Sequence, residues 1–173
     1  MSALELAQSL IKIKSISPED GGCFDLIEAE LTPLGFQIEK IPELNCETLL
    51  AKYGDSGKVF CYLGHTDVVP SGPEDEWTSP PFEANIVEGE LIGRGAADMK
   101  GSVAVFIESV KKFLADHPNP NFQIWVMLTS NEEGEPADGK INTLMESLTN
   151  QNQFIDYCLV GEASSSDSVG DVL

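Results

Sequence analysis

Three short apolar segments of this chain each end within a few residues of a side chain that could bind a metal ion. The segments are residues 59–63, 124–128 and 157–160, which precede His65 and Asp67, Glu132 and Glu133, and Glu162, respectively. Nearly unbroken hydrophobic segments are typical of strands buried on both faces, so they predict a largely parallel sheet covered by helices. Since the carboxyl ends of parallel strands form the functional crevice of such a sheet, we expect the polar residues to meet at one edge. A histidine among carboxylates suits a hydrolytic zinc centre.

The remaining pattern predicts an α/β fold. Apolar residues recur at helical spacing over residues 3–14, 24–34, 103–114 and 141–148, and further strands are expected over 36–41 and 48–53. Strands alternate with helices after residue 58, which indicates a largely parallel mixed sheet flanked by helices. With 173 residues and a hydrophobic content of 42%, the chain is long enough to form one globular unit with its own core.

Composition limits the partners of the chain. Its formal net charge of −19 at pH 7 repels nucleic acids and anionic membranes, so we expect neither as a partner. The absence of a signal sequence and of a membrane-length segment favours a cytoplasmic protein, in which the four cysteines are reduced, buried or nearly buried thiols. Arg94 is the only arginine, whereas recognition of an anionic substrate normally uses several guanidinium groups. Either the substrate is not strongly anionic, or the residues that bind it lie outside this chain.

Two of the polar clusters can be explained with or without a metal ion. His65 and Asp67 are two residues apart at a strand end, so their side chains share one face, where Asp67 can accept a hydrogen bond from a metal-bound imidazole. The same pair is compatible with a polar turn. Asp98 lies in a segment rich in glycine and alanine before the most regular predicted helix. It is compatible with a metal-bridging carboxylate and equally with a helix N-cap.

The later clusters are also open to two interpretations. Glu132 and Glu133 are adjacent at a strand end, where like charges repel each other in a confined crevice. A metal ion gives them different roles, because one carboxylate can coordinate it while the other accepts a proton from metal-bound water. The alternative is an acidic surface loop. Glu162 is a single acid that gains meaning only from the other clusters. His117 follows a predicted helix, where its charge would offset the helix dipole, so it is expected to be structural.

Five motifs, at residues 64–70, 77–82, 93–101, 129–134 and 161–164, occur in a fixed order along the chain. Together they resemble the zinc amidohydrolases, a family that includes aminoacylases, acetylornithine deacetylase and succinyl-diaminopimelate desuccinylase, with the closest likeness to the bacterial desuccinylases. The resemblance implies a zinc-peptidase-like catalytic domain with two zinc ions, for which cobalt can substitute. It also implies a small N-acyl amino acid substrate, here N-succinyl-LL-2,6-diaminopimelate, which is hydrolysed to succinate and LL-2,6-diaminopimelate for lysine and cell-wall synthesis.

The same resemblance gives each candidate residue a role. It implies that His65 and Glu162 bind one zinc ion, that Glu133 binds the other, that Asp98 bridges them, that Glu132 is the general acid/base, and that Asp67 orients His65. It further implies a cis peptide bond after Asp98.

Relatives in this family are longer than this chain. Residues 1–173 are therefore expected to be the N-terminal portion of the catalytic domain, and the apolar residues within 170–173 agree by suggesting the start of another element. The absent parts are the lid or dimerisation domain, through which full-length relatives form homodimers, and the C-terminal catalytic part with a second zinc-binding histidine. We expect an incomplete site that holds its second zinc ion weakly. The alternatives are an acetylornithine deacetylase or aminoacylase-like amidohydrolase, and a non-catalytic metal-binding or interaction module.

Overall fold

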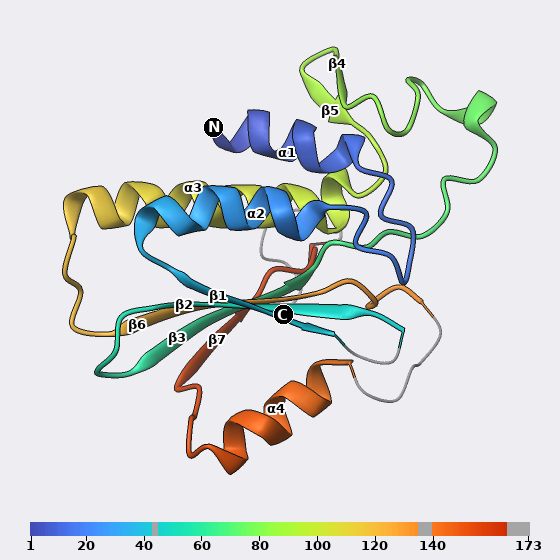
Figure 1. Ribbon diagram of the computed structural model, residues 1–173. Coiled ribbons are helices and arrows are strands. Elements are labelled where there is room, and N and C mark those ends of the chain that lie inside the picture. The colour runs from blue at the N-terminus through green and yellow to red at the C-terminus, as the bar shows by residue number, and fades with distance from the viewer. Residues whose placement is uncertain (43–44, 135–139, 166–173) are drawn as a thin grey trace.

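A five-stranded sheet forms the centre of the computed structural model, which describes residues 1–42, 45–134 and 140–165 (Figure 1). In spatial order the strands are β1 (Gln37–Pro42), β2 (Glu47–Tyr53), β6 (Gln123–Thr129), β3 (Val59–His65) and β7 (Tyr157–Val160). β2 is antiparallel to β1 and β6, whereas β3 is parallel to β6 and β7. Four of these five strands therefore point in one direction, which confirms the predicted largely parallel mixed sheet. The element expected at residues 170–173 lies outside the described residues.

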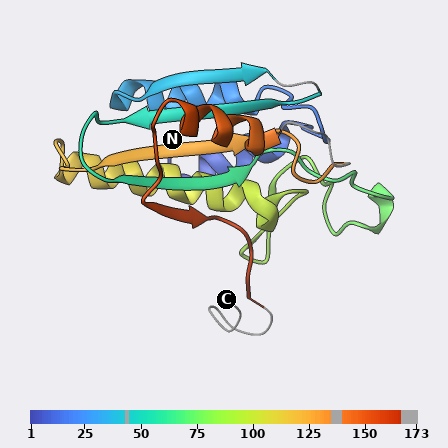
Figure 2. The same ribbon diagram turned by 90° about the horizontal axis from the view of Figure 1, so that it is seen from below.

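Helices cover both faces of the sheet. One face carries α1 (Ala3–Lys12), α2 (Cys23–Leu31) and α3 (Gly101–Asp116), and α4 (Lys140–Asn150) lies across the other (Figures 1 and 2). None of the described helices combines the length and hydrophobicity needed to span a membrane. The four predicted helices are confirmed.

Two of these helices end earlier than their apolar periodicity suggested. The chain becomes extended at Ile13, directly after α1. A 3₁₀ turn, Thr32–Leu34, replaces the last expected turn of α2, because Pro33 has no N–H to continue the α-helical hydrogen bonds. The start of α1 is well defined, since Ser2 and Glu5 form a capping box.

β6 shows why its sequence lacks alternating polar residues. Ile124, Val126 and Leu128 belong to the core beneath α1, α2 and α3, while Trp125 and Met127 belong to the core beneath α4. Successive side chains of a strand point to opposite faces, and here both faces are buried. The unbroken apolar segment is thus explained by helices on both sides of the sheet.

β7 departs from the expectation of a strand buried on both faces. It pairs with β3 at the edge of the described sheet (Figure 2), and Tyr157, Leu159 and Val160 are 55%, 47% and 54% exposed. Cys158 is exposed too, so the expectation of a buried or nearly buried thiol is wrong at this position. The apolar composition of a strand does not tell whether neighbours cover it, because that depends on its place in the sheet.

The single arginine stabilises a loop. Arg94 follows the hairpin of β4 (Asn85–Val87) and β5 (Glu90–Ile92), and its guanidinium carbon lies 5.1 Å from the centre of the Trp77 ring. Its Nη2 donates to the carbonyl oxygen of Pro70 at 3.3 Å. The Trp77 indole donates to the carbonyl oxygen of Ser71 at 3.0 Å. The guanidinium is thus engaged by the cation–π contact and its own hydrogen bond, and together with the Trp77 hydrogen bond these contacts hold the loop after β3.

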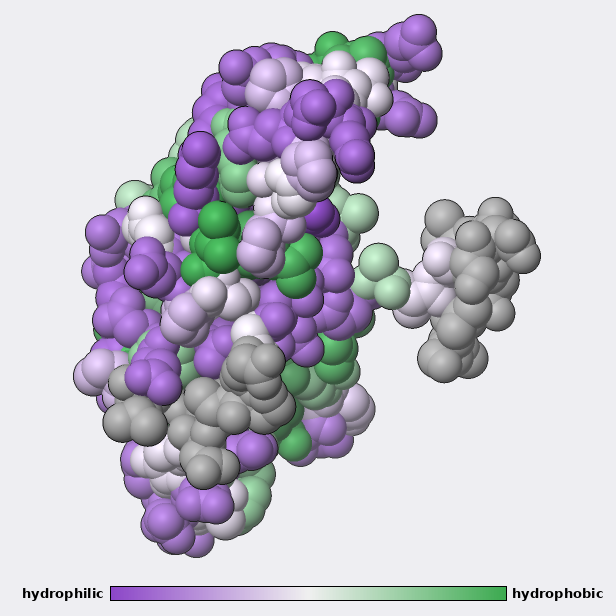
Figure 3. Space-filling view, turned by 90° about the vertical axis from the view of Figure 1, so that its right-hand side faces the viewer, coloured by the Kyte–Doolittle hydropathy of each residue, from purple (hydrophilic) through white to green (hydrophobic). Residues whose placement is uncertain are grey.

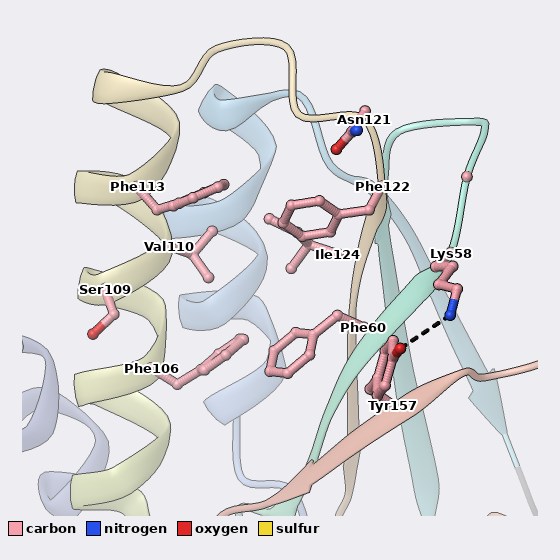
Figure 4. A pocket seen from close by; sticks show the side chains of 11 residues that line it. Lys58, Phe60, Phe106, Ser109, Val110, Phe113, Asn121, Phe122, Ile124 and Tyr157 are labelled. Atoms are coloured by element: carbon pink, nitrogen blue, oxygen red, sulfur yellow. Dashed lines mark hydrogen bonds between the residues drawn. The ribbon is translucent and has the colours of Figure 1, made fainter.

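An apolar groove of about 700 Å³ lies at the amino ends of β3, β6 and β7 (Figure 4). Aromatic rings contribute much of its lining, namely those of Phe60, Phe106, Phe113, Phe122 and Tyr157. The candidate ligands follow the carboxyl ends of the same strands, and hydrophilic residues predominate on that side of the molecule (Figure 3). The groove and the predicted metal centre are therefore separate features.

Candidate metal centre

His65 is the last residue of β3, and only 1% of its side chain is exposed. Its Nδ1 lies 2.9 Å from the main-chain carbonyl oxygen of Asp67 and 3.5 Å from Oδ1 of the Asp67 carboxylate. Because a carbonyl oxygen can only accept, Nδ1 carries a hydrogen and donates it, which leaves Nε2 as the nitrogen available to a metal ion. Asp67 thus orients the imidazole through its main chain and its carboxylate.

Two carboxylates from distant parts of the chain face Nε2 of His65. Oδ1 of Asp98 lies 3.0 Å from this nitrogen, and Oε1 of Glu162 lies 3.3 Å from it. The carboxylates are 54% and 40% exposed, so they border solvent while the imidazole is buried. The end of β3, the turn before α3 and the residues after β7 therefore meet at one point.

Asp98 belongs to the turn Ala96–Lys100, which connects the β4–β5 hairpin to α3. The peptide bond between Asp98 and Met99 is cis, as the family resemblance implied. Asp98 is not the N-cap of α3, since Lys100 occupies that position and makes no side-chain capping bond. The N-cap interpretation is therefore wrong.

Glu162 is positioned by close packing at Gly161. A Cβ atom at Gly161 would lie 2.1 Å from the hydroxyl oxygen of Tyr62, so only glycine allows this approach. The hydroxyl of Ser102, at the start of α3, donates to the Gly161 carbonyl oxygen at 2.7 Å and lies 2.9 Å from the Tyr62 hydroxyl. These contacts hold the segment after β7 against the segment that follows Asp98.

Glu132 and Glu133 follow β6 on the other side of His65. The atoms of His65, Glu132 and Glu133 that could bind a metal lie within 4.8 Å of one another, as do those of His65, Asp98 and Glu162. His65 is common to both groups. The structure therefore brings four of the predicted carboxylates, those of Asp98, Glu132, Glu133 and Glu162, together with His65 at one end of the sheet.

Asp67 is fully buried and joins His65 to the two glutamates. The backbone N–H of Glu132 donates to Oδ1 of Asp67 at 3.0 Å, and that of Glu133 donates to Oδ2 at 3.1 Å. The hydroxyl of Ser17 donates to Oδ2 as well. Burial acts to raise the pKa of Asp67, but the hydrogen bonds with His65, Ser17 and the two amides outweigh it and hold the pKa below its usual range. The Asp67 carboxylate at the centre of this network is therefore ionised.

Negative charge accumulates around the imidazole. Burial raises the pKa of Glu133 and of Glu162, and the charge of Asp98 raises both further while His65 opposes it. Burial disfavours a charge on His65 itself, but the hydrogen bonds and charge of Asp67 raise its pKa to about 9. A cation among these groups would offset the repulsion between the carboxylates, so the charge distribution favours a metal ion.

The donor set fits zinc. The ligands of a tetrahedral zinc ion lie about 2.0–2.2 Å from the metal and hence about 3.3 Å from one another. Nε2 of His65 is 3.0 Å from the Asp98 carboxylate and 3.3 Å from the Glu162 carboxylate, close to that separation. An imidazole with carboxylates is also the kind of mixed nitrogen and oxygen set that zinc binds.

His117 lies far from these ligands. It caps the C-terminal end of α3, and its ring centre is 4.8 Å from that of Phe113. Asp98 precedes the opposite end of this 16-residue helix, and a helix of that length extends about 24 Å. His65 is therefore the histidine that the chain brings to the metal centre.

The sequence did not predict the hydrogen bonds that the side chains of Ser17 and Lys100 make. Lys100 is fully buried, and its ammonium group donates to the carbonyl oxygens of Leu10 at 2.9 Å and Ile13 at 2.8 Å. The sequence offers one indication of their importance, which is their position. Lys100 lies in the motif around Asp98, and Ser17 lies between two predicted helices. Neither position reveals the distant acceptor.

Solved structures share this fold. Human carnosine dipeptidase 1 superposes with a TM-score of 0.82 at 23% identity, over 94% of this chain and 38% of that chain. The M20 family metallo-carboxypeptidase Sso-CP2 from Sulfolobus solfataricus superposes with a TM-score of 0.78 at 23% identity, over 95% of this chain and 38% of that chain. At such identities the likeness concerns the fold alone.

Curated relatives are more similar in sequence. A succinyl-diaminopimelate desuccinylase of Marinobacter nauticus is 47% identical over 98% of this chain, and one of Halorhodospira halophila is 49% identical over 99%. This chain spans about 45% of the length of either relative. The resemblance inferred from the motifs is thereby confirmed, and it supports binding of a divalent metal ion. Residues 61–172 match the model of peptidase family M20/M25/M40, and the chain belongs to this family.

Proposed function

We propose that this chain is the metal-binding N-terminal portion of the catalytic domain of a zinc-dependent amide hydrolase of the succinyl-diaminopimelate desuccinylase type. The observation that carries the proposal is the convergence of His65, Asp98 and Glu162, with Glu132 and Glu133 beside them. The sequence identity between this chain and the desuccinylases supports the substrate class, N-succinyl-LL-2,6-diaminopimelate.

Each ligand has a role in this proposal. His65 and Glu162 would hold one zinc ion, Glu133 would hold a second, and Asp98 would contribute its carboxylate to both. The distances from His65 to Asp98 and Glu162 support the first assignment. A carboxylate oxygen of Glu133 lies within 4.8 Å of a ring nitrogen of His65, so Glu133 belongs to the same centre and is available for the second ion. Cobalt is expected to substitute for zinc, because it accepts the same nitrogen and oxygen donors.

The protein side chains around the metal have complementary tasks. Bound zinc supplies a Lewis acid that polarises the amide carbonyl and acidifies a water molecule. Glu132 accepts the proton of that water on its carboxylate and returns it to the leaving nitrogen. Asp67 keeps the His65 ring oriented and holds the Glu132–Glu133 backbone in place. Water and N-succinyl-LL-2,6-diaminopimelate are thus converted to succinate and LL-2,6-diaminopimelate.

This chain by itself offers an incomplete version of that site. A zinc ion normally has about four ligands, and the second ion receives Asp98 and Glu133 from this chain in our assignment. Arg94 is engaged with Trp77 and Pro70, so recognition of the succinyl carboxylate is expected to use other residues of a complete enzyme. We therefore infer that this chain alone holds one zinc ion more tightly than a second and has little turnover.

A related amidohydrolase for a less anionic substrate, such as an N-acetyl amino acid, is the second candidate. The engaged guanidinium of Arg94 favours it, because binding of several carboxylates normally needs free cationic groups.

Residual hydrolysis of N-succinyl-LL-2,6-diaminopimelate and of N-acetylornithine by the zinc-loaded chain, followed over long incubations because turnover is expected to be slow, separates these candidates. The matched control is Glu132→Gln, which should keep zinc while removing any turnover, since an amide cannot accept the proton. Turnover of the acetylated substrate alone would favour the second candidate. A chain that binds no zinc would contradict both and favour a non-catalytic module.

A further inference from the structure

The connection between α1 and α2 runs beside the segment that follows His65. Residues Ile16 and Val68 form a parallel β-bridge, in which Ser17 N donates to the Val68 carbonyl oxygen at 3.2 Å and Val68 N donates to that of Ser15 at 2.9 Å. The backbone of this connection is therefore held by main-chain hydrogen bonds, without help from the Ser17 side chain.

The side chain of Ser17 instead reaches the Asp67 carboxylate. Its hydroxyl donates to Oδ2, the oxygen that also accepts the N–H of Glu133. Asp67 is fully buried, and a buried carboxylate depends on its hydrogen-bond donors because it has lost those of water. Among the donors that the described residues provide to this carboxylate, Ser17 contributes a hydroxyl, Glu132 and Glu133 contribute amides, and His65 contributes Nδ1 at 3.5 Å.

The loop that carries the two glutamates also rests on Ser17. A Cβ atom at Gly134 would lie 3.2 Å from Cβ of Ser17, so Gly134, which follows Glu133, lies directly against this residue. The Ser130 hydroxyl, at the start of the loop, donates to the carbonyl oxygen of Pro18 at 2.9 Å. Residues on both sides of Glu132 and Glu133 therefore contact the Ser17–Pro18 pair.

We propose that Ser17 is a positioning residue of the metal centre: its hydroxyl fixes the orientation of the Asp67 carboxylate, which in turn holds the backbone of Glu132 and Glu133. The terminal torsion of an aspartate has a broad distribution of allowed angles, so the Ser17 hydroxyl restricts the rotation that the two amides and the more distant His65 Nδ1 permit. The inference rests on the proposed function, because positioning matters only if these side chains bind a metal ion.

Zinc affinity of Ser17→Ala, measured by competition with a chromophoric chelator, tests this inference. Loss of the partner that directly orients a metal ligand typically weakens metal binding about 10- to 100-fold, and Ser17 acts on that partner, so the dissociation constant should rise by about tenfold, the lower end of that range. The absorption spectrum of the cobalt-loaded variant should change as well, since it reports the geometry of the ligands. Far-UV circular dichroism checks that the variant is folded.

Ser15→Ala is the matched control for loss of a hydroxyl from the same connection. Ser15 is buried and donates to the Thr66 carbonyl oxygen at 2.7 Å, not to the Asp67 carboxylate. It should lower the melting temperature at least as much as Ser17→Ala but change zinc affinity less. Equal losses of zinc affinity in the two variants would overturn a positioning role for Ser17.

A double variant tests whether Ser17 acts through Asp67. Residues that act through one network give non-additive effects, so Ser17→Ala should add little to the loss of zinc affinity caused by Asp67→Asn. Additive losses, or a Ser17→Ala chain with unchanged affinity and cobalt spectrum, would contradict the inference while leaving the proposed function intact. Failure of the unsubstituted chain to bind zinc would remove both.

Discussion

Nε2 of His65 lies 3.0 Å from Oδ1 of Asp98, although the two residues are 33 positions apart in the sequence. One ends a buried strand and the other lies in the turn before α3. The contact joins two segments that the chain separates by a loop and a hairpin, and Glu162 completes it from the end of a third segment. The candidate metal centre thus results from the sheet, whose parallel strands bring their carboxyl ends to one edge.

Zinc binding should strengthen with pH up to about 9. A metal ion binds the neutral imidazole, and the pKa of His65 is raised to about 9, so below that pH a proton competes for the ring. The fraction of neutral imidazole falls about tenfold for each pH unit below the pKa, and apparent zinc affinity should fall with it. Chelator competition at several pH values between about 6 and 9 measures this slope. A plateau already above about pH 7 would show that His65 has an ordinary pKa.

Asp67→Asn should weaken zinc binding and flatten its pH dependence. The variant keeps the size of the side chain but removes the negative charge and hydrogen bonding that raise the pKa of His65 against the effect of burial. The proton should therefore compete less at neutral pH. Loss of this orienting partner should also cost about 10- to 100-fold in affinity at alkaline pH, where His65 is neutral in both chains. The same chelator competition gives both values, and an unchanged pH slope would argue that Asp67 does not control the imidazole.

Gly161→Ala should destabilise the fold and weaken zinc binding together. The new methyl group would lie 2.1 Å from the Tyr62 hydroxyl oxygen and 2.7 Å from Cε of Met99, so the segment that carries Glu162 has to move. Overpacking of this kind costs roughly 1–3 kcal/mol. Thermal unfolding and zinc titration measure the two effects.

Gly72→Ala is the comparison for this variant. Gly72 has a φ angle of 72°, and its added Cβ would contact nothing within 4 Å. The free energy of unfolding of this variant should fall only by the cost of a left-handed residue that is not glycine, about 1–2 kcal/mol, and its zinc affinity should be unchanged. If Gly161→Ala also kept wild-type affinity, the packing at Gly161 would not be what positions Glu162.

The convergence of the candidate ligands could be predicted from sequence because each follows a local pattern. His65 and the glutamates after β6 are preceded by apolar segments that form strands by themselves, and parallel strands fix where those residues arrive. Asp98 was harder to interpret, since the same sequence is compatible with an N-cap. The family resemblance favoured the metal interpretation, and the 3.0 Å distance to His65 places its carboxylate beside the other candidate ligands.

Other features depend on contacts that no local pattern encodes. The exposure of Leu159 follows from the position of β7 at the sheet edge. The hydrogen bond from Ser17 to Asp67 spans 50 positions, and that from Lys100 to Leu10 spans 90. Serine and lysine side chains are normally exposed, so the residue type alone predicts that Ser17 and Lys100 are solvated. In this fold, distant acceptors bind both side chains instead.

Zinc content by elemental analysis, for the unsubstituted chain, His65→Ala and His117→Ala, tests the central claim most directly. The two variants remove the two histidines of the sequence, one at the metal centre and one at the far end of α3. We predict about one tightly bound zinc ion in the unsubstituted chain and in His117→Ala, and its loss in His65→Ala. Equal zinc content in both variants, or none in the unsubstituted chain, would contradict a zinc centre at His65.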